Sequence, residues 1–197
     1  IALLITTNPR IIAFQDNWAV STKGVFDFFK PYRTLSKWNI TGNEGNEPWF
    51  GHLENHIEIH KDQPVFDGQY SNRCYTERVK EAYFRFKELT AIQGPLYNKW
   101  HSLLMHLPYA YQGRRMFCEI FALDAETPLL TGNDDAAGYS DMLKEISKSD
   151  AYIAFVSQKL HPAERASSLI GNLYTGSVFM GLLSALSHYI DNDEAIS

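Results

Sequence analysis

The amino-acid sequence predicts a layered α/β fold, because segments typical of buried strands alternate with segments of helical periodicity. Residues 1–6 begin with a continuous apolar run of the kind that buried strands show. Residues 71–89 repeat apolar side chains at helical spacing, with charged residues on the opposite face. Residues 173–189 read as a further helix, rich in small residues. The 197 residues are enough for one domain with a sizeable core.

Composition excludes several classes of protein. Apolar residues make up 45% of the chain, which argues against disorder, and the net charge of −5 argues against general nucleic-acid binding. The two cysteines are far apart, so we read both as reduced thiols of a cytoplasmic protein. The sequence shows neither the pattern of a signal peptide nor an apolar stretch long enough to cross a membrane.

The chain is expected to start inside a fold. It opens on Ile1 rather than on Met, within the first predicted strand, and buried strands need neighbours on both sides. A turn at Asn8–Pro9 precedes a possible second strand at 11–14. The acidic end, residues 191–194, is expected to be a solvated tail or the approach to a further segment.

Two segments of contrasting character follow. Lys30 to Gln63 is polar and contains several glycines and prolines, which predicts a long irregular segment that is either functional or mobile. The helix at 71–89 comes next, and either Ser71 or Asn72 is suited to cap it.

The second half of the chain is predicted to alternate short elements. They are a strand at 103–105, a helix at 109–123, a loop at 127–137, a helix at 139–146, a helix or strand at 152–156 and a last helix at 173–189. Asn172 is a good N-cap for the last helix. The small residues within that helix allow another backbone to approach closely, as suits a helix inside a domain.

His106 is the first candidate for chemistry. It ends the strand at 103–105, and Pro108 stops that strand because proline lacks a ladder donor. Ligands of open α/β sheets bind at the carboxyl ends of strands, and a histidine there can donate a proton or a hydrogen bond near neutral pH. The alternative is a structural histidine whose ring is satisfied by backbone groups.

Asn172 and the pair Arg114–Arg115 are further candidates. An asparagine cap uses its side-chain oxygen and leaves its amide to point at a ligand, whereas the sequence alone favours the alternative, a plain helix cap. Two arginines at the start of the helix after His106 could hold a phosphate through their planar forks. The alternative for the arginines is a solvated helix face.

Other reactive side chains give weaker signals. Cys74 and Cys118 show neither a basic partner nor an electropositive setting, so both are expected to be structural. His52, His56 and His60 are spaced by four, but interleaved glutamates favour a surface strand or loop, and we expect no metal site.

Three segments together resemble hydroxymethylglutaryl-CoA synthases. They are residues 26–31 (FDFFKP) followed by 64–75 (PVFDGQYSNRCY), residues 106–109 (HLPY) and residues 171–178 (GNLYTGSV). Each is modest alone, but their order and spacing over nearly the whole chain make the resemblance specific.

The resemblance implies a thiolase-like fold, built of two similar α/β halves in layers, of which this chain would hold only part. Residues 1–30 would end the N-terminal half, and residues 31–197 would form the C-terminal domain, incomplete at its own C-terminal end. Such enzymes acetylate a cysteine with acetyl-CoA, and a glutamate then helps the acetyl group attack acetoacetyl-CoA. Both CoA thioesters are substrates, so no cofactor and no metal are implied.

The resemblance also assigns residues. His106 would engage the acetoacetyl group, Asn172 and Ser71 would contact substrate, and Asp27 and Phe28 would lie near the acyl pocket. Arg115 falls at a CoA-binding lysine of the family, and Tyr111 at another, so the phosphate contacts differ in detail. The segment from Lys30 to Gln63 is longer than in many members. The family's nucleophilic cysteine and catalytic glutamate belong to the half that is absent, so the fragment alone is expected to be inactive.

The same resemblance implies two partners, the missing N-terminal half and a second copy of the full-length enzyme in a homodimer. It also implies a cytoplasmic location and a place in the mevalonate pathway. Two alternatives stay open. One is a polyketide β-branching synthase, whose acceptor is bound to a carrier protein. Comparing acetoacetyl-CoA with acetoacetyl carrier protein as the acceptor would distinguish the two kinds of synthase. The other is a non-catalytic interaction module, which would bind no acyl-CoA.

Overall fold

The computed structural model describes residues 5–9, 12–43, 45–49, 51–125 and 136–195. The chain divides into two compact units. Residues 21–81 form one of them, here called the ribbon unit, and the residues before and after form the other, the helical unit.

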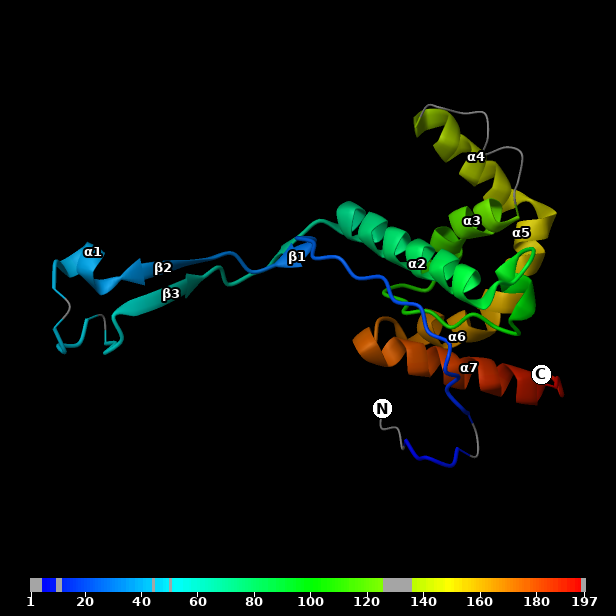
Figure 1. Ribbon diagram of the computed structural model, residues 1–197, viewed down its shortest axis with the longest axis horizontal. Coiled ribbons are helices and arrows are strands. Elements are labelled where there is room, and N and C mark those ends of the chain that lie inside the picture. Colours follow the sequence, from blue (N-terminus) through cyan, green and yellow to red (C-terminus); the bar gives the residue numbers. More distant parts are fainter. Residues whose placement is uncertain (1–4, 10–11, 44, 50, 126–135, 196–197) are drawn as a thin grey trace. The chain divides into compact units, whose positions relative to one another are not determined.

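The ribbon unit consists of two antiparallel strand pairs and a short helix (Figure 1). The strand β1 (Phe28–Phe29) pairs with β4 (Val65–Phe66), and β2 (Tyr32–Ser36) pairs with β3 (His56–His60). The helix α1 (Lys37–Thr41) follows β2 directly. The predicted irregular segment from Lys30 to Gln63 is therefore a strand pair with a helix at its tip. The alternation of apolar and polar residues in β3 (HIEIH) is the signal for a strand that this expectation missed.

The helix α2 (Gly68–Thr90) contributes its first part to the ribbon unit and its last part to the helical unit. It begins three residues earlier than predicted. Its start is capped by Asp67, whose Oδ1 accepts a hydrogen bond from the backbone N–H of Tyr70 at 2.9 Å. Ser71 and Asn72, the expected caps, lie inside the first turns instead.

The helical unit contains the remaining elements. They are η1 (Leu96–Lys99), α3 (Gln112–Asp124), α4 (Ala136–Lys148), α5 (Asp150–Phe155), the π-helical turn η3 (Val156–Leu160), α6 (His161–Ile170), η4 (Tyr174–Gly176) and α7 (Ser177–Asp191). The helices predicted at 109–123, 139–146 and 173–189 are confirmed in type, with shifted boundaries. The segment at 152–156 is helical. The predicted loop at 127–137 lies largely outside the described residues.

Aromatic rings from several elements form the core of the helical unit. Phe117 of α3 stacks on Phe155 of α5 with ring centroids 5.2 Å apart, and Tyr97 of η1 stacks on Phe121 at 5.0 Å. Such ring pairs each contribute about 0.5–1.5 kcal/mol beyond the area they bury. Neighbouring Leu96 and Ile120 have no exposed surface.

Helices α6 and α7 lie side by side, as Figure 1 shows. A Cβ on Gly181 would lie 3.6 Å from the carbonyl oxygen of Ala163, so the backbones approach closely at this glycine. Ser184 of α7 bonds to α6 twice, donating to the oxygen of Pro162 at 2.7 Å and accepting from the N–H of Ala166 at 3.2 Å. The predicted close approach to the small residues of the last helix is confirmed.

The strands predicted outside residues 28–66 are wrong wherever the structure describes them. Ile5–Thr6 and residues 12–14 are not strands, and residues 1–4 and 11 lie outside the described part. Residues 103–105 form no ladder, because the N–H of Leu103 bonds instead to the carbonyl of Lys159 in η3 at 2.8 Å. An apolar run of three residues suits either a strand in a sheet or a segment packed against a helix. Only the part of the chain that lies beside it decides between the two.

Candidate functional site

The side chain of His106 is held by the start of α7. Its Nδ1 lies 2.6 Å from Oγ of Ser177, and the same hydroxyl oxygen accepts a hydrogen bond from the backbone N–H of Leu107 at 3.2 Å. Ser177 is fully buried and His106 is half-buried. The two residues are 71 positions apart in sequence, so tertiary packing alone brings them together.

Three hydrogen bonds to Lys159 hold the segment that carries His106. The backbone carbonyl of Lys159 in η3 accepts hydrogen bonds from the backbone N–H of Leu103 and from the hydroxyl of Ser102. The ammonium of Lys159 donates to the carbonyl of Trp100 at 2.6 Å. His106 is thus carried on a segment that hydrogen bonds hold to η3.

The start of α3 packs tightly against the same segment. A Cβ built on Gly113 would lie 3.2 Å from Cδ2 of Leu107 and 3.3 Å from the sulfur of Met105. A Cβ at position 113 would require the ends of these two side chains to shift by a few tenths of an ångström. The sequence therefore places a glycine where α3 and this segment touch.

The two arginines at the start of α3 differ in their surroundings. Arg114 pairs with the carboxylate of Glu164 in α6, which is buried, and its guanidinium lies 4.9 Å over the ring of Tyr111. Arg115 is exposed, with Nη1 at 3.4 Å from the hydroxyl of Tyr109. The charge of Arg114 is therefore neutralised within the fold, whereas Arg115 presents its charge to solvent.

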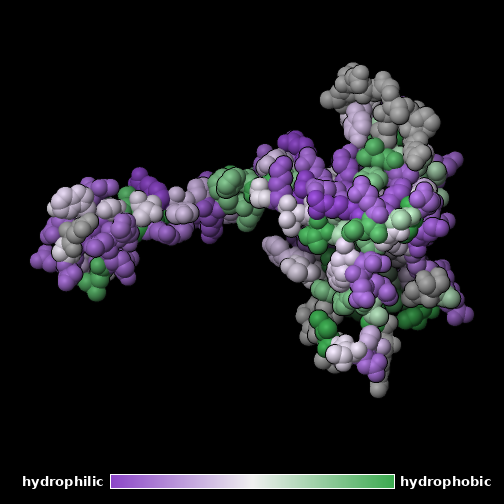
Figure 2. Space-filling view, in the orientation of Figure 1, coloured by the Kyte–Doolittle hydropathy of each residue, from purple (hydrophilic) through white to green (hydrophobic). Residues whose placement is uncertain are grey.

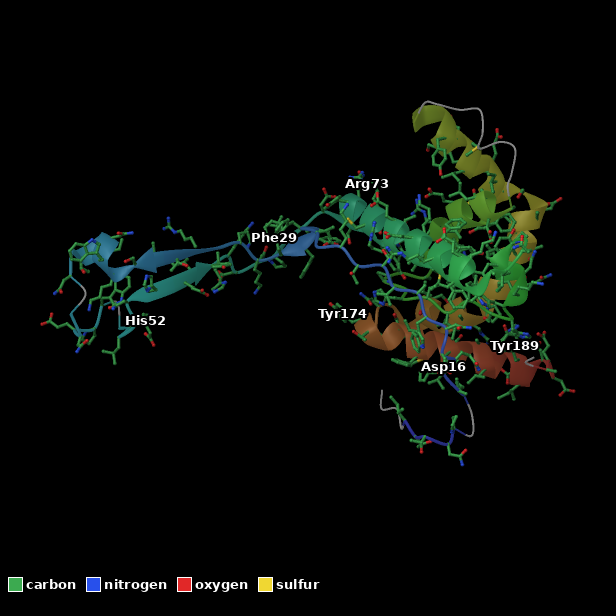
Figure 3. All side chains as sticks on the ribbon, viewed as in Figure 1. Asp16, Phe29, His52, Arg73, Tyr174 and Tyr189 are labelled. Carbon is green, nitrogen blue, oxygen red and sulfur yellow. The ribbon has the colours of Figure 1, made fainter. Side chains whose placement is uncertain are left out.

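Asn172 lies in the loop that leads into α7, and its role as a cap differs from the prediction. Its Oδ1 accepts a hydrogen bond from the backbone N–H of Tyr174, two residues on, at 2.7 Å, which is an Asx turn rather than a helix cap. Helix α7 itself begins at Ser177, after Gly176. Figure 3 labels Tyr174, next to this loop, and Tyr189, near the other end of α7. Asn172 is exposed, and its amide nitrogen takes no part in this bond.

Asp27, Phe28 and Ser71 belong to the ribbon unit, and backbone hydrogen bonds through Asp67 connect Asp27 with Ser71. The carbonyl of Asp27 accepts from the N–H of Asp67 at 3.1 Å, and the carbonyl of Asp67 accepts from the N–H of Ser71 at 2.8 Å. Phe28 pairs with Phe66 across the strands, with ring centroids 6.0 Å apart. Figure 2 shows hydrophobic residues gathered here, and Phe26, Phe28 and Phe66 are all more than 60% exposed.

Cys118 is poorly suited to act as a nucleophile. Burial raises the pKa of the Cys118 thiol to about 11, with a smaller contribution from the nearby carboxylate of Glu119. Its sulfur lies 3.5 Å from the carbonyl of Leu143, inside the α3–α4 contact. Cys74 is half-buried on α2, and the two cysteines form no disulfide.

The described residues contain no group of three or more histidine, cysteine or acidic side chains that could hold a metal ion. His56 and His60 lie on β3, each paired across to β2, which confirms the expectation of a surface strand. Within the described part of the chain, no helix is long and apolar enough to cross a membrane.

Sequence reasoning missed three residues of this site: Ser177, Glu164 and Lys159. Ser177 stands inside the quoted segment 171–178, but nothing in a local pattern links it to His106. Glu164 sits on the buried face of α6, where an acidic residue among apolar neighbours is a signal that could have found it.

Comparison with solved structures identifies the class of fold. The chain superimposes on the structure described as MvaS in complex with 3-hydroxy-3-methylglutaryl coenzyme A, with a TM-score of 0.57 and 22% identity. The match covers 88% of this chain and 35% of that one. The chain has part of a thiolase-like α/β fold, which confirms the fold class predicted from the sequence.

The family follows from comparison of sequences. The family model described as hydroxymethylglutaryl-coenzyme A synthase C terminal matches residues 56–196, and the chain belongs to this family. It is 23% identical to a hydroxymethylglutaryl-CoA synthase of Enterococcus faecalis over 188 residues, 95% of this chain and 35% of the relative. It is also 30% identical to the hydroxymethylglutaryl-CoA synthase erg13A of Aspergillus fumigatus over 151 residues, 64% of this chain and 32% of the relative. The chain thus spans about a third of the length of the curated relatives it matches.

Proposed function

We propose that this chain is the acetoacetyl-CoA-binding part of a synthase that condenses acetyl-CoA with acetoacetyl-CoA to 3-hydroxy-3-methylglutaryl-CoA. The observation that carries the proposal is His106, half-buried and held by Ser177 at the start of α7, in a chain of the synthase family. The nucleophilic cysteine and the catalytic glutamate would come from the remainder of the enzyme, because Cys118 is buried with a raised pKa.

The chemistry asks this part of the enzyme for hydrogen-bond donors. Condensation builds negative charge on the ketone oxygen of the acceptor, and fixed donors in a water-poor site stabilise such charge without reorganising. His106 would donate to that oxygen, and the amide of Asn172 would contact the substrate from the loop before α7. Ser71, Asp27 and Phe28 would contact substrate near the acyl pocket.

Arg115 would bind a phosphate of CoA. It is exposed at the start of α3, and its neighbour Arg114 is already paired with Glu164. Tyr111, which lies under the guanidinium of Arg114, would border this CoA contact with its ring rather than with a charge. Both substrates are thioesters of CoA, so the proposed reaction requires no separate cofactor.

The rest of the proposal concerns the whole protein. The N-terminal half would complete the active site, two copies of the full-length enzyme would form a homodimer, and the enzyme would act in the cytoplasm in isoprenoid synthesis. Exposed apolar side chains support the presence of further protein over α6 and α7. Leu169, Leu183 and Ile190 are 80%, 54% and 76% exposed.

The test separates the two half-reactions in the enzyme that contains this chain. His106→Ala should lower the rate of condensation by about a hundred- to a thousand-fold, the usual loss for one transition-state donor. Acetylation of the nucleophilic cysteine from labelled acetyl-CoA should proceed as before, since His106 would act only on the second substrate. His101→Ala, a substitution in the same segment, is the matched control.

The result that would overturn the proposed role is loss of acetylation together with condensation in a folded His106→Ala protein. His106 would then belong to the machinery of the nucleophile. Normal condensation by the variant would equally contradict the proposal.

A further inference from the structure

We propose that Ser177 is a positioning residue that fixes the neutral form of His106 with its proton on Nε2. The contacts that carry this inference are the 2.6 Å approach of Ser177 Oγ to His106 Nδ1 and the 3.2 Å hydrogen bond from Leu107 N–H to the same oxygen. The tautomer follows from these contacts alone, and its use in condensation rests on the proposed function.

The direction of the hydrogen bond follows from counting donors and acceptors. A serine hydroxyl has one hydrogen to donate and two lone pairs that accept. One lone pair of Ser177 receives the N–H of Leu107. Because Ser177 is fully buried, its own hydrogen needs an acceptor within the protein. Among the contacts of the described residues, the acceptor within reach is Nδ1 of His106.

The opposite arrangement is less favourable. If Nδ1 carried the proton and donated to Ser177, the hydroxyl hydrogen would be left without an acceptor in a position that water does not reach. A buried polar group left unpaired costs about 1–3 kcal/mol. That cost corresponds to a preference of about five- to 150-fold for the form with the proton on Nε2 at 25 °C.

This arrangement gives His106 a defined chemical role. A neutral ring whose Nδ1 accepts from Ser177 can only donate at Nε2, so the ring presents a hydrogen-bond donor without carrying a positive charge. A donor is what a ketone oxygen that gains negative charge requires. Ser177 thereby keeps His106 from presenting an acceptor at Nε2, which would repel that oxygen.

The experiment reads the tautomer directly by nitrogen NMR. The full chain is labelled with ¹⁵N-histidine, and the ring nitrogens are recorded at a pH where imidazole is neutral, with His106→Gln to assign the His106 signals. We expect an acceptor-type shift for Nδ1 and a protonated-type shift for Nε2. The reverse pair of shifts, or shifts that average the two forms, would overturn the proposal whatever the enzyme's activity.

Variants test whether Ser177 is the cause. Ser177→Ala should lose the single tautomer and give averaged shifts, whereas Ser177→Thr, which keeps the hydroxyl, should retain it. Ser184→Ala is the matched control, since Ser184 also lies on α7 and bonds to backbone groups, but of α6. An unchanged single tautomer in folded Ser177→Ala would show that another group sets it. Should Ser177→Ala not fold, the wild-type and Ser177→Thr spectra still decide.

Activity then separates this inference from the proposed function. In the enzyme that contains the chain, Ser177→Ala should lower kcat of condensation more than it raises KM, and cysteine acetylation should persist. If the NMR result holds while condensation is unaffected, the tautomer assignment stands and the role of His106 in the proposed function fails.

Discussion

Asp124 is a fully buried carboxylate at the end of α3 that joins three parts of the helical unit. It accepts from the hydroxyl of Tyr83 at 2.5 Å and from the N–H of Leu96 at 2.6 Å, and it pairs with the ammonium of Lys87. Its side chain has no exposed surface. The carboxylate therefore links α2, η1 and α3 through charge-assisted hydrogen bonds.

We expect Asp124→Ala to lower the free energy of unfolding by about 3–5 kcal/mol, because it leaves the buried donors of Tyr83 and Leu96 and the partly buried ammonium of Lys87 without this acceptor. Urea unfolding followed by circular dichroism measures the change. Asp141→Ala is the control, since Asp141 pairs with Lys144 at the surface with its side chain 73% exposed, and such pairs contribute about 0–1 kcal/mol. Equal effects of the two substitutions would contradict the assignment.

Arg114 and Arg115 are neighbours for which we expect opposite effects. Arg114→Ala should destabilise the fold by about 3–5 kcal/mol, because it leaves Glu164 buried without its cation. Arg115→Ala should leave stability within about 0.5 kcal/mol of the parent, since its side chain is exposed.

Under the proposed function, Arg115→Ala should instead raise KM for acetoacetyl-CoA, and more strongly at low salt, where phosphate contacts are least screened. Steady-state kinetics at two salt concentrations, with thermal unfolding of the same samples, would check both halves. A rise in KM that does not depend on salt would argue against a phosphate contact.

At the scale of elements, the strand pair β2–β3 ends in a tip that is organised by a buried lysine. Lys37 is 3% exposed, and its ammonium donates to the carbonyls of Gly45 and Glu47. The backbone N–H of Lys37 donates to the carbonyl of Asn55 at 2.8 Å. Trp49 is buried beside this loop and donates to the carbonyl of Glu54 at 2.6 Å. The side chain of Lys37 thus holds the Gly45–Glu47 part of the loop, while its backbone N–H bonds to Asn55 on the other side.

Lys37→Met should keep the apolar stem but lose these donors, which we expect to cost the tip about 1–3 kcal/mol in local stability. Hydrogen exchange at the amides of Trp49 and His52, which bond to each other's carbonyls at 2.9 Å, should accelerate accordingly. Lys61→Met, an exposed lysine of the same unit, should leave these rates unchanged. Protection that survives Lys37→Met would show that the tip does not depend on the ammonium.

At the scale of the whole molecule, buried phenols make stability sensitive to alkaline pH. Burial raises the pKa of Tyr97 to about 12, with a smaller contribution from Asp124, and it raises the pKa values of Tyr83, Tyr139 and Tyr152 as well. A phenol is neutral when protonated. Between the unfolded pKa near 10 and the folded pKa, the native state therefore holds more protons than the unfolded state, and stability falls as pH rises.

We expect the free energy of unfolding to decline from about pH 10 upward, with each such tyrosine adding up to about 1.4 kcal/mol per pH unit. Urea titrations from pH 8 to pH 11 would measure the slope. Tyr97→Phe should make it shallower, and Tyr174→Phe, at a position 77% exposed, should not. A slope that Tyr97→Phe leaves unchanged would place the effect elsewhere.

The sequence by itself determined the family and the helices α2, α3, α4 and α7, whereas it did not predict α1 or α6. The apolar periodicity of 71–89 and the small residues of 173–189 are visible within each segment. The helices α2 and α7 could therefore be predicted without knowing which elements pack against them. The motifs at 106–109 and 171–178 identified the synthase family, and the domain boundary placed at residue 30 stays a prediction. The strand at 103–105 was wrong because pairing depends on which backbone lies alongside, and here that is η3.

Only the tertiary structure decided how the candidate site is held together. Ser177 reaches His106 across 71 positions, and Glu164 reaches Arg114 across 50, distances over which no local pattern carries information. The sequence also could not show which of Arg114 and Arg115 pairs within the fold and which is exposed, because the two are adjacent and chemically identical. Burial and partners made one of them structural and left the other exposed, because the environment of a charged group is set by the elements that pack around it.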